Sequence, residues 1–242
     1  MNKRIGLAFL TYPVNEDRMS YLTRALIEAA THITASQDEL ICFCSCESAA
    51  ENFAKRSDSD KLPPIDVLKP YAKTKKRIER LCRAFRVQLR WNSWPPSMGA
   101  NENNAMQIAF DELHCDYMML HIDDCYATEP IDLSEGIAFL EENPDVDILR
   151  YHWSPRKECK PIMTELGAWQ QVDPQSKWFY DDSPHVRRSD YVAKFGRHYK
   201  GRPIDCGRTE SETNRVLRAR GARIVATSHR MFEKDGPVSA SR

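Results

Sequence analysis

Residues Asp116–Glu129 read D-Y-M-M-L-H-I-D-D-C-Y-A-T-E. A mostly apolar run, Tyr117–Ile122, leads directly into two adjacent carboxylates, Asp123 and Asp124. An uninterrupted apolar run of this length is typical of a strand that is buried on both faces of a sheet. Open α/β sheets bind their ligands at the carboxyl ends of such strands. The stretch therefore predicts a central strand with two carboxylates at a ligand-binding edge.

Asp123 and Asp124 have two interpretations. Their hard oxygen atoms suit Mg²⁺ or Mn²⁺ bound together with the phosphates of a substrate. Aspartate is also common in a turn or a cap directly after a strand, where its role is structural. The stretch alone supports both interpretations equally.

The composition is that of a globular chain long enough for one large domain. Of the 242 residues, 41% are hydrophobic and 29% are charged, which excludes a disordered chain. The 35 basic and 35 acidic residues give a formal net charge of +0, which argues against a wholly basic nucleic-acid-binding protein. No apolar run approaches the roughly 20 residues that span a bilayer, so we expect no membrane partner.

The start of the chain and its cysteines indicate a compartment. Met1–Ile5 leads directly into a strand-like run, without the apolar core of a signal peptide. We therefore expect a cytoplasmic protein, or one in the host cytoplasm if the chain is viral. In that compartment the eight cysteines are expected to be free thiols. Cys42, Cys44 and Cys46 alternate along one expected strand, and we interpret them as packing residues rather than zinc ligands.

Strands and helices alternate along the chain. A strand at 5–10, a helix at 21–33 and a strand at 39–46 form the βαβ unit of a parallel sheet. The further expected elements are a short strand at 65–68, a helix within 69–90, a helix at 105–113 capped by 101–104, a helix at 131–142, a strand at 147–153, an irregular segment at 154–182, helices at 185–195 and 210–220, and a last strand at 223–227. This order predicts an α/β fold of one domain, with a Rossmann-like mixed, mainly parallel sheet flanked by helices.

The expected helix within 69–90 carries nine basic residues and a single acid, Glu79. Apolar residues at helical spacing, among them Ile78, Cys82 and Phe85, form one stripe of it. One interpretation is an amphipathic helix with a solvated basic face. The other is a surface that follows the phosphates of a nucleic acid.

Taken together, the order of the elements and three motifs resemble the A-type (GT-A) nucleotide-sugar glycosyltransferases, in particular the inverting enzymes of the family-2 type. The first motif is L-H-I-D-D-C at 120–125, which is similar to the acidic motif of that family. The resemblance implies that Asp123 contacts the nucleotide ribose or a metal, that Asp124 binds the metal, and that the metal is Mn²⁺ or Mg²⁺. Cys125 stands where the family often has a third acid, and thiolate is a poor ligand for Mg²⁺.

The second motif, at 99–117, resembles the family helix that precedes the acidic motif. It reads G-A-N-E-N-N-A-M-Q-I-A-F-D-E-L-H-C-D-Y, and the resemblance implies that Asn101 and Asn104 face the donor. The opening T-Y-P at 11–13 also looks like the first loop of the family. By that likeness Thr11 and Tyr12 would hold the base and ribose of the nucleotide.

The third motif, T-E-S-E-T-N-R-V-L-R-A-R-G-A-R-I at 209–224, resembles the acidic helix of the family. Glu210 stands at the position of the catalytic base, where the family usually has aspartate, and Glu212 matches a later substrate-binding glutamate. Without the resemblance, both acids would be interpreted as N-terminal helix residues favoured by the macrodipole. His229 matches a histidine that often binds the metal, although a lone histidine is more often structural. Arg187 and Arg188 could meet phosphate or lie on a solvated surface.

The resemblance implies transfer of a sugar from a nucleoside diphosphate sugar, with a uridine sugar expected, to an acceptor hydroxyl with inversion. Residues 1–125 would form the nucleotide-sugar-binding half and residues 126–242 the acceptor-binding half. The acceptor would be a hydroxymethylated base in viral DNA or a glycan. The alternatives are nucleotidyl transfer to a sugar phosphate, which usually needs a glycine-rich first loop, and a non-catalytic nucleotide- or nucleic-acid-binding protein. The sequence does not predict an oligomeric state.

Overall fold

The computed structural model describes residues 2–11, 16–47, 65–92, 98–151, 159–164, 167–176, 179–181, 183–198, 206–228 and 230–234. Its centre is a nine-stranded sheet with the order β4-β3-β1-β5-β11-β8-β12-β10-β9. The bounds of these strands along the chain are β1 Arg4–Thr11, β3 Glu39–Glu47, β4 Gln88–Asn92, β5 Tyr117–Ile122, β8 Ile148–Arg150, β9 Cys159–Thr164, β10 Gly167–Val172, β11 His185–Arg188 and β12 Ile224–Thr227.

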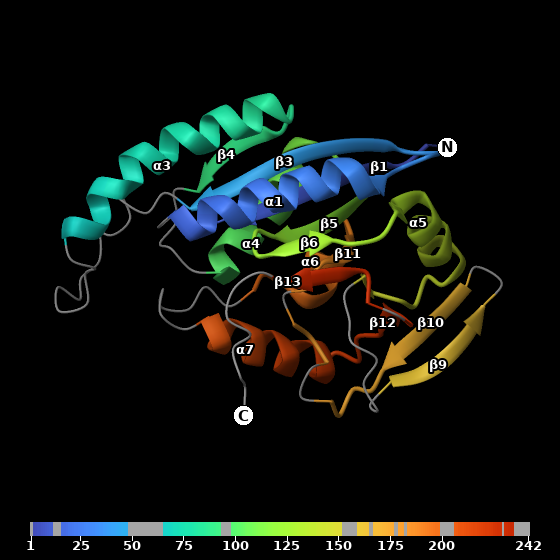
Figure 1. The fold of residues 1–242 in the computed structure, drawn as a ribbon. Helices are drawn as coiled ribbons and strands as arrows, with labels where there is room; N and C mark the ends of the chain where they lie inside the picture. Colours follow the sequence, from blue (N-terminus) through green and yellow to red (C-terminus); the bar gives the residue numbers. More distant parts are fainter. Residues whose placement is uncertain are drawn as a thin grey trace.

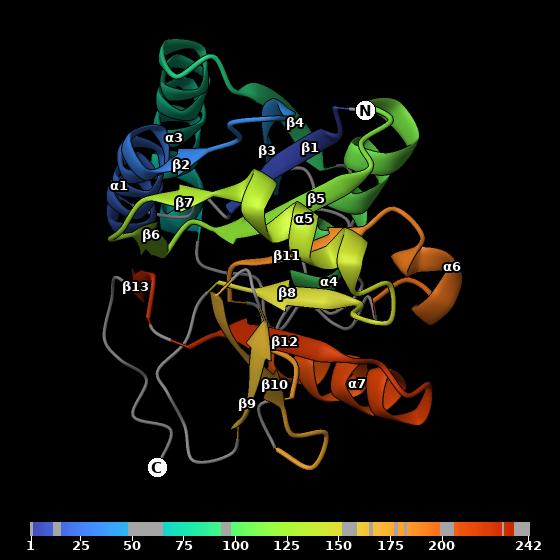
Figure 2. The same cartoon turned by 90° about the vertical axis from the view of Figure 1, so that its right-hand side faces the viewer.

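The sheet is mixed, because two of its strands run opposite to the others. β4, β3, β1 and β5 are parallel neighbours. β11 is antiparallel to both β5 and β8, and β10 is antiparallel to both β12 and β9. The other strands of the sheet therefore all run in one direction. Figure 2 shows β5, β11, β8 and β12 in succession, with the hairpin of β9 and β10 beyond them. Strands from the N-terminal and the C-terminal parts of the chain therefore belong to one sheet.

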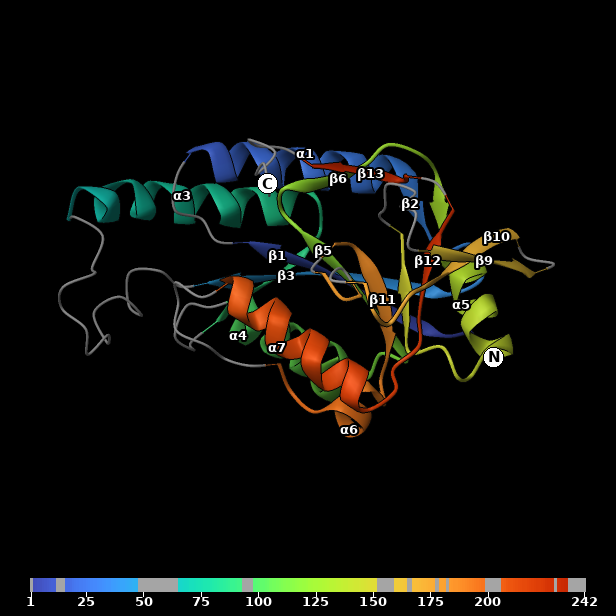
Figure 3. The same cartoon turned by 90° about the horizontal axis from the view of Figure 1, so that it is seen from below.

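The helices cover both faces of this sheet (Figures 1 and 3). Their bounds are α1 Glu16–His32, α3 Ile65–Ala84, α4 Met98–Met106, α5 Leu133–Glu142, α6 Tyr191–Phe195 and α7 Cys206–Ala219. Figure 3 shows α1 and α3 on one face and α4, α6 and α7 on the other. Two small strand pairs complete the described structure, β2 Ile33–Thr34 with β7 Ile131–Asp132, and β6 Cys125–Ala127 with β13 Phe232–Lys234. None of the described helices is long and apolar enough to cross a membrane.

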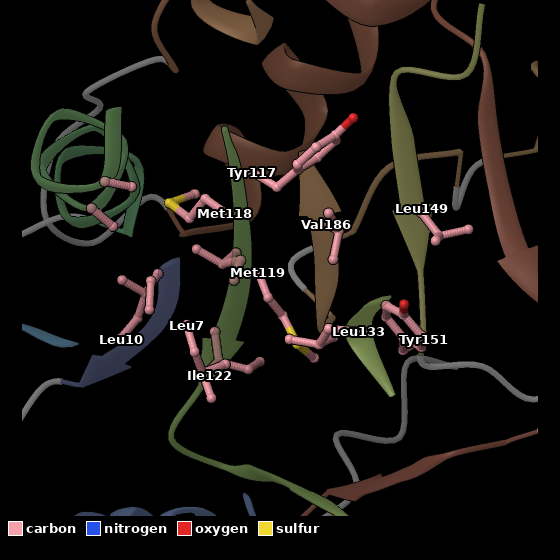
Figure 4. Packing of buried hydrophobic residues seen from close by; sticks show 14 of the residues in the cluster. Leu7, Leu10, Tyr117, Met118, Met119, Ile122, Leu133, Leu149, Tyr151 and Val186 are labelled. Carbon is pink, nitrogen blue, oxygen red and sulfur yellow. The ribbon is translucent and has the colours of Figure 1, made fainter. Parts of the chain in front are cut away.

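The core lies around β5, and all six of its residues are buried. Figure 4 shows Met118 and Met119 of β5 among side chains of the neighbouring strands, including Leu7 of β1 and Val186 of β11. Burial on both faces explains why this strand has no polar alternation. The α/β class, with a mixed, mainly parallel sheet flanked by helices, is confirmed.

The basic segment departs from the prediction at both ends. Residues 65–68, expected as a strand, form the start of α3, because their apolar positions continue the helical spacing of that helix. α3 then ends at Ala84 rather than near Arg90. Arg86 has a φ of 55°, which does not continue a helix, and the following residues form β4 beside β3.

The segment between β8 and α6 contains strands that the sequence did not predict. Cys159–Thr164 and Gly167–Val172 pair as the antiparallel strands β9 and β10, where the sequence predicted an irregular segment. Residues 185–188, expected as the start of a helix, form β11, and only the short α6 is helical there. β11 carries His185 and Arg187 in fully buried positions, so its polar composition hid a strand that lies inside the sheet.

The starts of the helices also differ from the predictions. α1, expected at 21–33, is Glu16–His32, and α7, expected at 210–220, is Cys206–Ala219. Asn101 and Asn104 lie inside α4 rather than capping a later helix, and α4 passes into a π-helix at Gln107–Glu112. α5 begins at Leu133, since Asp132 is its N-cap and accepts a hydrogen bond from the backbone N–H of Ser134. Gly221 follows the end of α7 with a φ of 68°, the left-handed conformation that glycine tolerates there.

Candidate functional site at the carboxyl ends of the central strands

The carboxyl ends of β1, β3 and β5 meet at one edge of the sheet. The three strands are parallel neighbours, so Thr11, Ser45 and Asp123 arrive there together. α1 follows β1 and α4 follows β4, and both helices therefore begin at this edge. Thr11, Ser45 and Asp123 are buried, as is Asn101 in the first turns of α4. This group of polar side chains, with Asn104, lies where the resemblance predicts the donor, and we call it the donor-edge cluster.

Asp123 is the centre of the donor-edge cluster and is only 4% exposed. The Thr11 hydroxyl donates a hydrogen bond of 2.7 Å to its Oδ2 atom. Nη1 of Arg18, in the first turn of α1, donates one of 2.7 Å to its Oδ1 atom. Burial raises the pKa of the Asp123 carboxyl to about 6, although Arg18 and the Thr11 hydroxyl both oppose this shift.

Asp124 is less buried and lies between two cations. Its Oδ2 atom is 3.6 Å from Nη1 of Arg18 and 3.4 Å from Nζ of Lys234. Lys234 is held there by the backbone, since β13 pairs with β6 and places Lys234 opposite Cys125. Cys125 itself is buried, with its Sγ atom 3.9 Å from Oδ1 of Asp124.

Hydrogen bonds join α4 to the ends of β1 and β3. The Ser45 hydroxyl donates to Oδ1 of Asn101 at 2.6 Å and accepts from Nδ2 of Asn104 at 2.9 Å. Nδ2 of Asn101 reaches the backbone carbonyl of Thr11 at 3.4 Å. The structure thus brings Thr11 of the opening motif, Asn101 and Asn104 of the second motif and Asp123 of the acidic motif into one cluster. Sequence reasoning missed Ser45, which lies between Cys44 and Cys46 in the sequence and points to the opposite face of β3.

Glu210 and Glu212 lie on α7, which contacts α4. α7 precedes β12, which runs in the same direction as β5, so α7 begins toward the edge where β5 ends (Figure 1). Glu210 is half-buried, and its backbone carbonyl accepts a hydrogen bond of 3.1 Å from Nδ2 of Asn214. Glu212 forms an ion pair of 2.9 Å with Arg215. Tyr12 and His229 lie outside the described residues.

Beneath α4 and α7 lies a second polar group, the sealed cluster of Glu102, Arg187, Tyr180 and His198. The side chains of Arg187 and Glu102 are 0% and 1% exposed, and Nη2 of Arg187 donates to Oε2 of Glu102 at 2.9 Å. Nη2 also donates to the Tyr180 hydroxyl at 2.6 Å. The expectation of a solvated or phosphate-binding Arg187 is therefore wrong, because β11 lies inside the sheet and turns this side chain into the interior.

The geometry of the sealed cluster fixes the tautomer of His198. Nη1 of Arg187 lies 3.1 Å from Nε2 of His198, and a guanidinium can only donate, so Nε2 accepts. The proton is then on Nδ1, which is 3.1 Å from Oε2 of Glu102. Burial, followed by the charge of Arg187, lowers the pKa of His198 well below its usual range. The imidazole is therefore neutral and links α6, α4 and β11.

A cavity of about 200 Å³ opens between α6 and α7. Its lining includes Phe195, Arg197, Glu212 and Arg215, and His198 lies at its base. The cavity does not include Asp123 or the rest of the donor-edge cluster. Glu212 thus faces a different part of the molecule from the acidic motif, although both belong to the resemblance.

The chemistry of the two carboxylates can be compared with what a divalent cation needs. Both oxygens of Asp123 have hydrogen-bond donors, and Asp124 has two cationic neighbours. Within the described ranges, no group of three His, Cys, Asp or Glu side chains is arranged to hold a metal ion. Arg18 and Lys234 would repel a divalent cation at this position. While Arg18 occupies this place, the arrangement does not fit Mn²⁺ or Mg²⁺, which stay predictions of the resemblance.

The similarity of this chain to known proteins is structural and distant. No protein-family model matches the chain, and no curated protein matches it. Among solved structures, a CMP:2-keto-3-deoxy-manno-octonic acid synthetase complexed with CTP matches with a TM-score of 0.49 and 10% identity, over 92% of this chain and 88% of that chain. A likeness at this level identifies neither a reaction nor a ligand.

Proposed function

We propose that this protein is a glycosyltransferase that binds a nucleoside diphosphate sugar at the donor-edge cluster and transfers the sugar to an acceptor hydroxyl. One observation carries the proposal. Asp123, Thr11 and Asn101 come from three separate segments that the sequence resemblance had each assigned to donor binding, and hydrogen bonds join them at the carboxyl ends of the central strands. That edge is where open α/β sheets bind nucleotides.

In the proposed reaction, the acceptor oxygen forms a bond to the anomeric carbon of the sugar. The bond from that carbon to the diphosphate oxygen breaks, and its electron pair leaves with the nucleoside diphosphate. Glu210 takes the proton of the acceptor hydroxyl on the face opposite the leaving group, which gives inversion. Asp123, held by Thr11 and Arg18, would orient the ribose. Residues 1–125 would hold the donor and residues 126–242 the acceptor.

The donor site is tested by thermal melting with UDP, GDP, UDP-glucose, GDP-mannose, UTP and CTP, each with Mn²⁺, Mg²⁺ or EDTA. A ligand at about 100 times its dissociation constant stabilises the folded state by about 2.7 kcal/mol, which is a measurable shift of Tm. Binding by a diphosphate or its sugar supports the proposal, and the effect of EDTA tests the expected Mn²⁺ or Mg²⁺. Binding by UTP or CTP alone would favour nucleotidyl transfer to a sugar phosphate, and no binding would remove both.

Glu210→Gln tests the catalytic base. We expect kcat to fall by about 10²–10⁴-fold while donor binding is unchanged, because a general base acts on the acceptor proton. Glu135→Gln is the matched control, since Glu135 is also an acid near a helix N-terminus, in the first turn of α5. Equal losses of donor binding and turnover in the Glu210 variant would contradict the role of a base.

The acceptor is a separate part of the proposal. α3 is amphipathic, with Ile78 and Cys82 buried and Lys76, Arg80 and Arg83 exposed, so its basic face is available to a polyanion. We propose a hydroxymethylated base in DNA as one acceptor class and a glycan as the other. Salt-dependent binding of hydroxymethylated DNA that is lost when Lys76, Arg80 and Arg83 are changed to glutamate would support the first. Absence of DNA binding at low salt would leave the glycan.

A further inference from the structure

Two cations from opposite ends of the chain approach the same carboxylate oxygen. Arg18 lies in the first turn of α1, and Lys234 lies on β13 near the end of the described chain. Both are within 4 Å of Oδ2 of Asp124, at 3.6 Å and 3.4 Å. Like charges repel one another at such a point, and they converge only where negative charge holds them. Asp123 and Asp124 supply that negative charge in this structure.

The same edge is electropositive for a second reason. α1 and α4 begin where β1 and β4 end, and α7 begins toward the same edge because β12 runs parallel to β8. The N-terminus of a helix carries partial positive charge and exposes backbone N–H groups, which favours anions. Figure 1 shows that α1, α4 and α7 all begin toward this edge.

We propose that Arg18 and Lys234 bind the diphosphate of the nucleotide sugar, so that the donor binds without a divalent cation. This inference rests on the proposed function and names the groups that neutralise the leaving diphosphate. A phosphate is a bidentate partner for a guanidinium, as a carboxylate is, and can replace Asp124 beside Arg18. Lys234 contributes a point charge to the same group. The two carboxylates thus hold the cations in place until the diphosphate arrives.

Arg18 and Lys234 are accessible enough to exchange the carboxylate of Asp124 for a diphosphate. The side chains of Arg18 and Lys234 are 36% and 53% exposed, whereas that of Asp123 is 4% exposed. An incoming diphosphate can therefore reach both cations without opening the core. Arg18 would keep its bond to the buried Asp123, which sets the direction of the guanidinium.

The test measures UDP, GDP and CDP binding to the full chain by calorimetry and melting, in excess EDTA and in Mn²⁺. Lys234→Met removes one charge from an exposed position, and Arg18→Lys keeps a charge beside Asp123 but loses the planar fork. Lys194→Met is the matched control, because Lys194 is also exposed and lies 3.4 Å from a carboxylate, that of Asp147, away from the donor edge.

The proposal predicts that at least one nucleotide binds in EDTA, that Mn²⁺ does not tighten binding, and that Lys234→Met and Arg18→Lys each weaken it by at least about tenfold. Lys194→Met should bind as the parent does. Binding only in the presence of Mn²⁺ or Mg²⁺, or binding that both variants retain, would overturn the inference and leave the proposed function intact. No binding of any nucleotide with or without metal would overturn both.

Discussion

Two arginine–carboxylate pairs in this molecule have almost the same length but opposite access to solvent. Arg18 donates to Asp123 at 2.7 Å at the open edge of the sheet, and Arg187 donates to Glu102 at 2.9 Å inside the sealed cluster. Arg18 is about one-third exposed, whereas Arg187 is fully buried. The hydrogen-bond distance alone would not tell these pairs apart.

The difference lies in what else each arginine contacts. Arg187 also meets Tyr180 and His198, so its charge has fixed partners on several sides and no ligand can reach it. The guanidinium of Arg18 lies beside two carboxylates, those of Asp123 and Asp124, and is partly exposed to solvent. A sealed pair of this kind holds α4 and β11 together, while an open pair can exchange one partner for a ligand. Exposure and the choice of partners, rather than distance, indicate function.

Replacing the arginine of each pair tests this comparison most strongly. Arg187→Met leaves Glu102 buried without its ion-pair partner and should lower the free energy of unfolding by about 3–5 kcal/mol. Arg18→Met should cost clearly less, because Asp123 keeps the Thr11 hydroxyl and its pKa is already raised toward the protonated form. Urea unfolding of both variants provides the measurement. Equal losses would show that the two pairs have the same structural role.

The pH dependence of stability compares Asp123 with a second buried group on the same segment, His121, because burial disfavours the charged form of both side chains. His121 on β5 has a pKa lowered to about 4 by burial, whereas that of Asp123 is raised to about 6. A lowered imidazole pKa means that the unfolded chain binds the proton first. The stability linked to His121 is therefore complete above pH 6.5 and is lost as pH falls toward 4. Asp123 acts with the opposite sign, because its contribution is lost as pH rises toward 6.

His121→Leu isolates the imidazole. The free energy of unfolding of the parent, minus that of the variant, should fall by roughly 3 kcal/mol between pH 7 and pH 4. Urea unfolding at several pH values measures this difference. Within the described residues the buried Nε2 atom of His121 has no hydrogen-bond partner, whereas Nδ1 lies 3.0 Å from the Ile122 carbonyl. The leucine therefore removes one hydrogen bond, and because that loss is the same at every pH it does not affect the predicted change with pH. A difference that does not change with pH would contradict a neutral, buried His121.

The smallest expected effect is the loss of stability when one hydroxyl is removed from the donor-edge cluster, compared with the loss when a surface hydroxyl is removed. Thr11→Val removes the hydrogen bond to Oδ2 of the buried Asp123 and should cost about 1 kcal/mol of unfolding free energy. The matched control is Thr31→Val, since the Thr31 hydroxyl bonds to the carbonyl of Ile27 on the exposed side of α1. We expect the control to change stability by less than about 0.5 kcal/mol. Equal values for the two variants would remove the special role of Thr11.

The sequence identified residues of the donor-edge cluster, whereas the donor and the chemistry assigned to them stay predictions. Thr11, Asn101, Asn104 and Asp123 were all chosen from short motifs, and the structure joins them in one cluster. Arg18 was missed, because nothing in its local sequence connects a helix residue to a carboxylate 105 positions away. The roles proposed for Glu210 and for a metal stay predictions, since they depend on groups that the geometry does not bring together with Asp123.

Local apolar patterns were enough to predict β1, β3, β5 and most of α1, because each has a continuous run or stripe of apolar residues that one type of element can bury. The order of residues along the chain also placed two carboxylates at the end of the central strand. Long-range contacts were needed to show that 185–188 is a strand, that β9 pairs with β10, and that Arg187 is sealed while Arg18 stays open. The burial of a polar side chain depends on partners far along the chain, such as Glu102 for Arg187, and no local pattern encodes them.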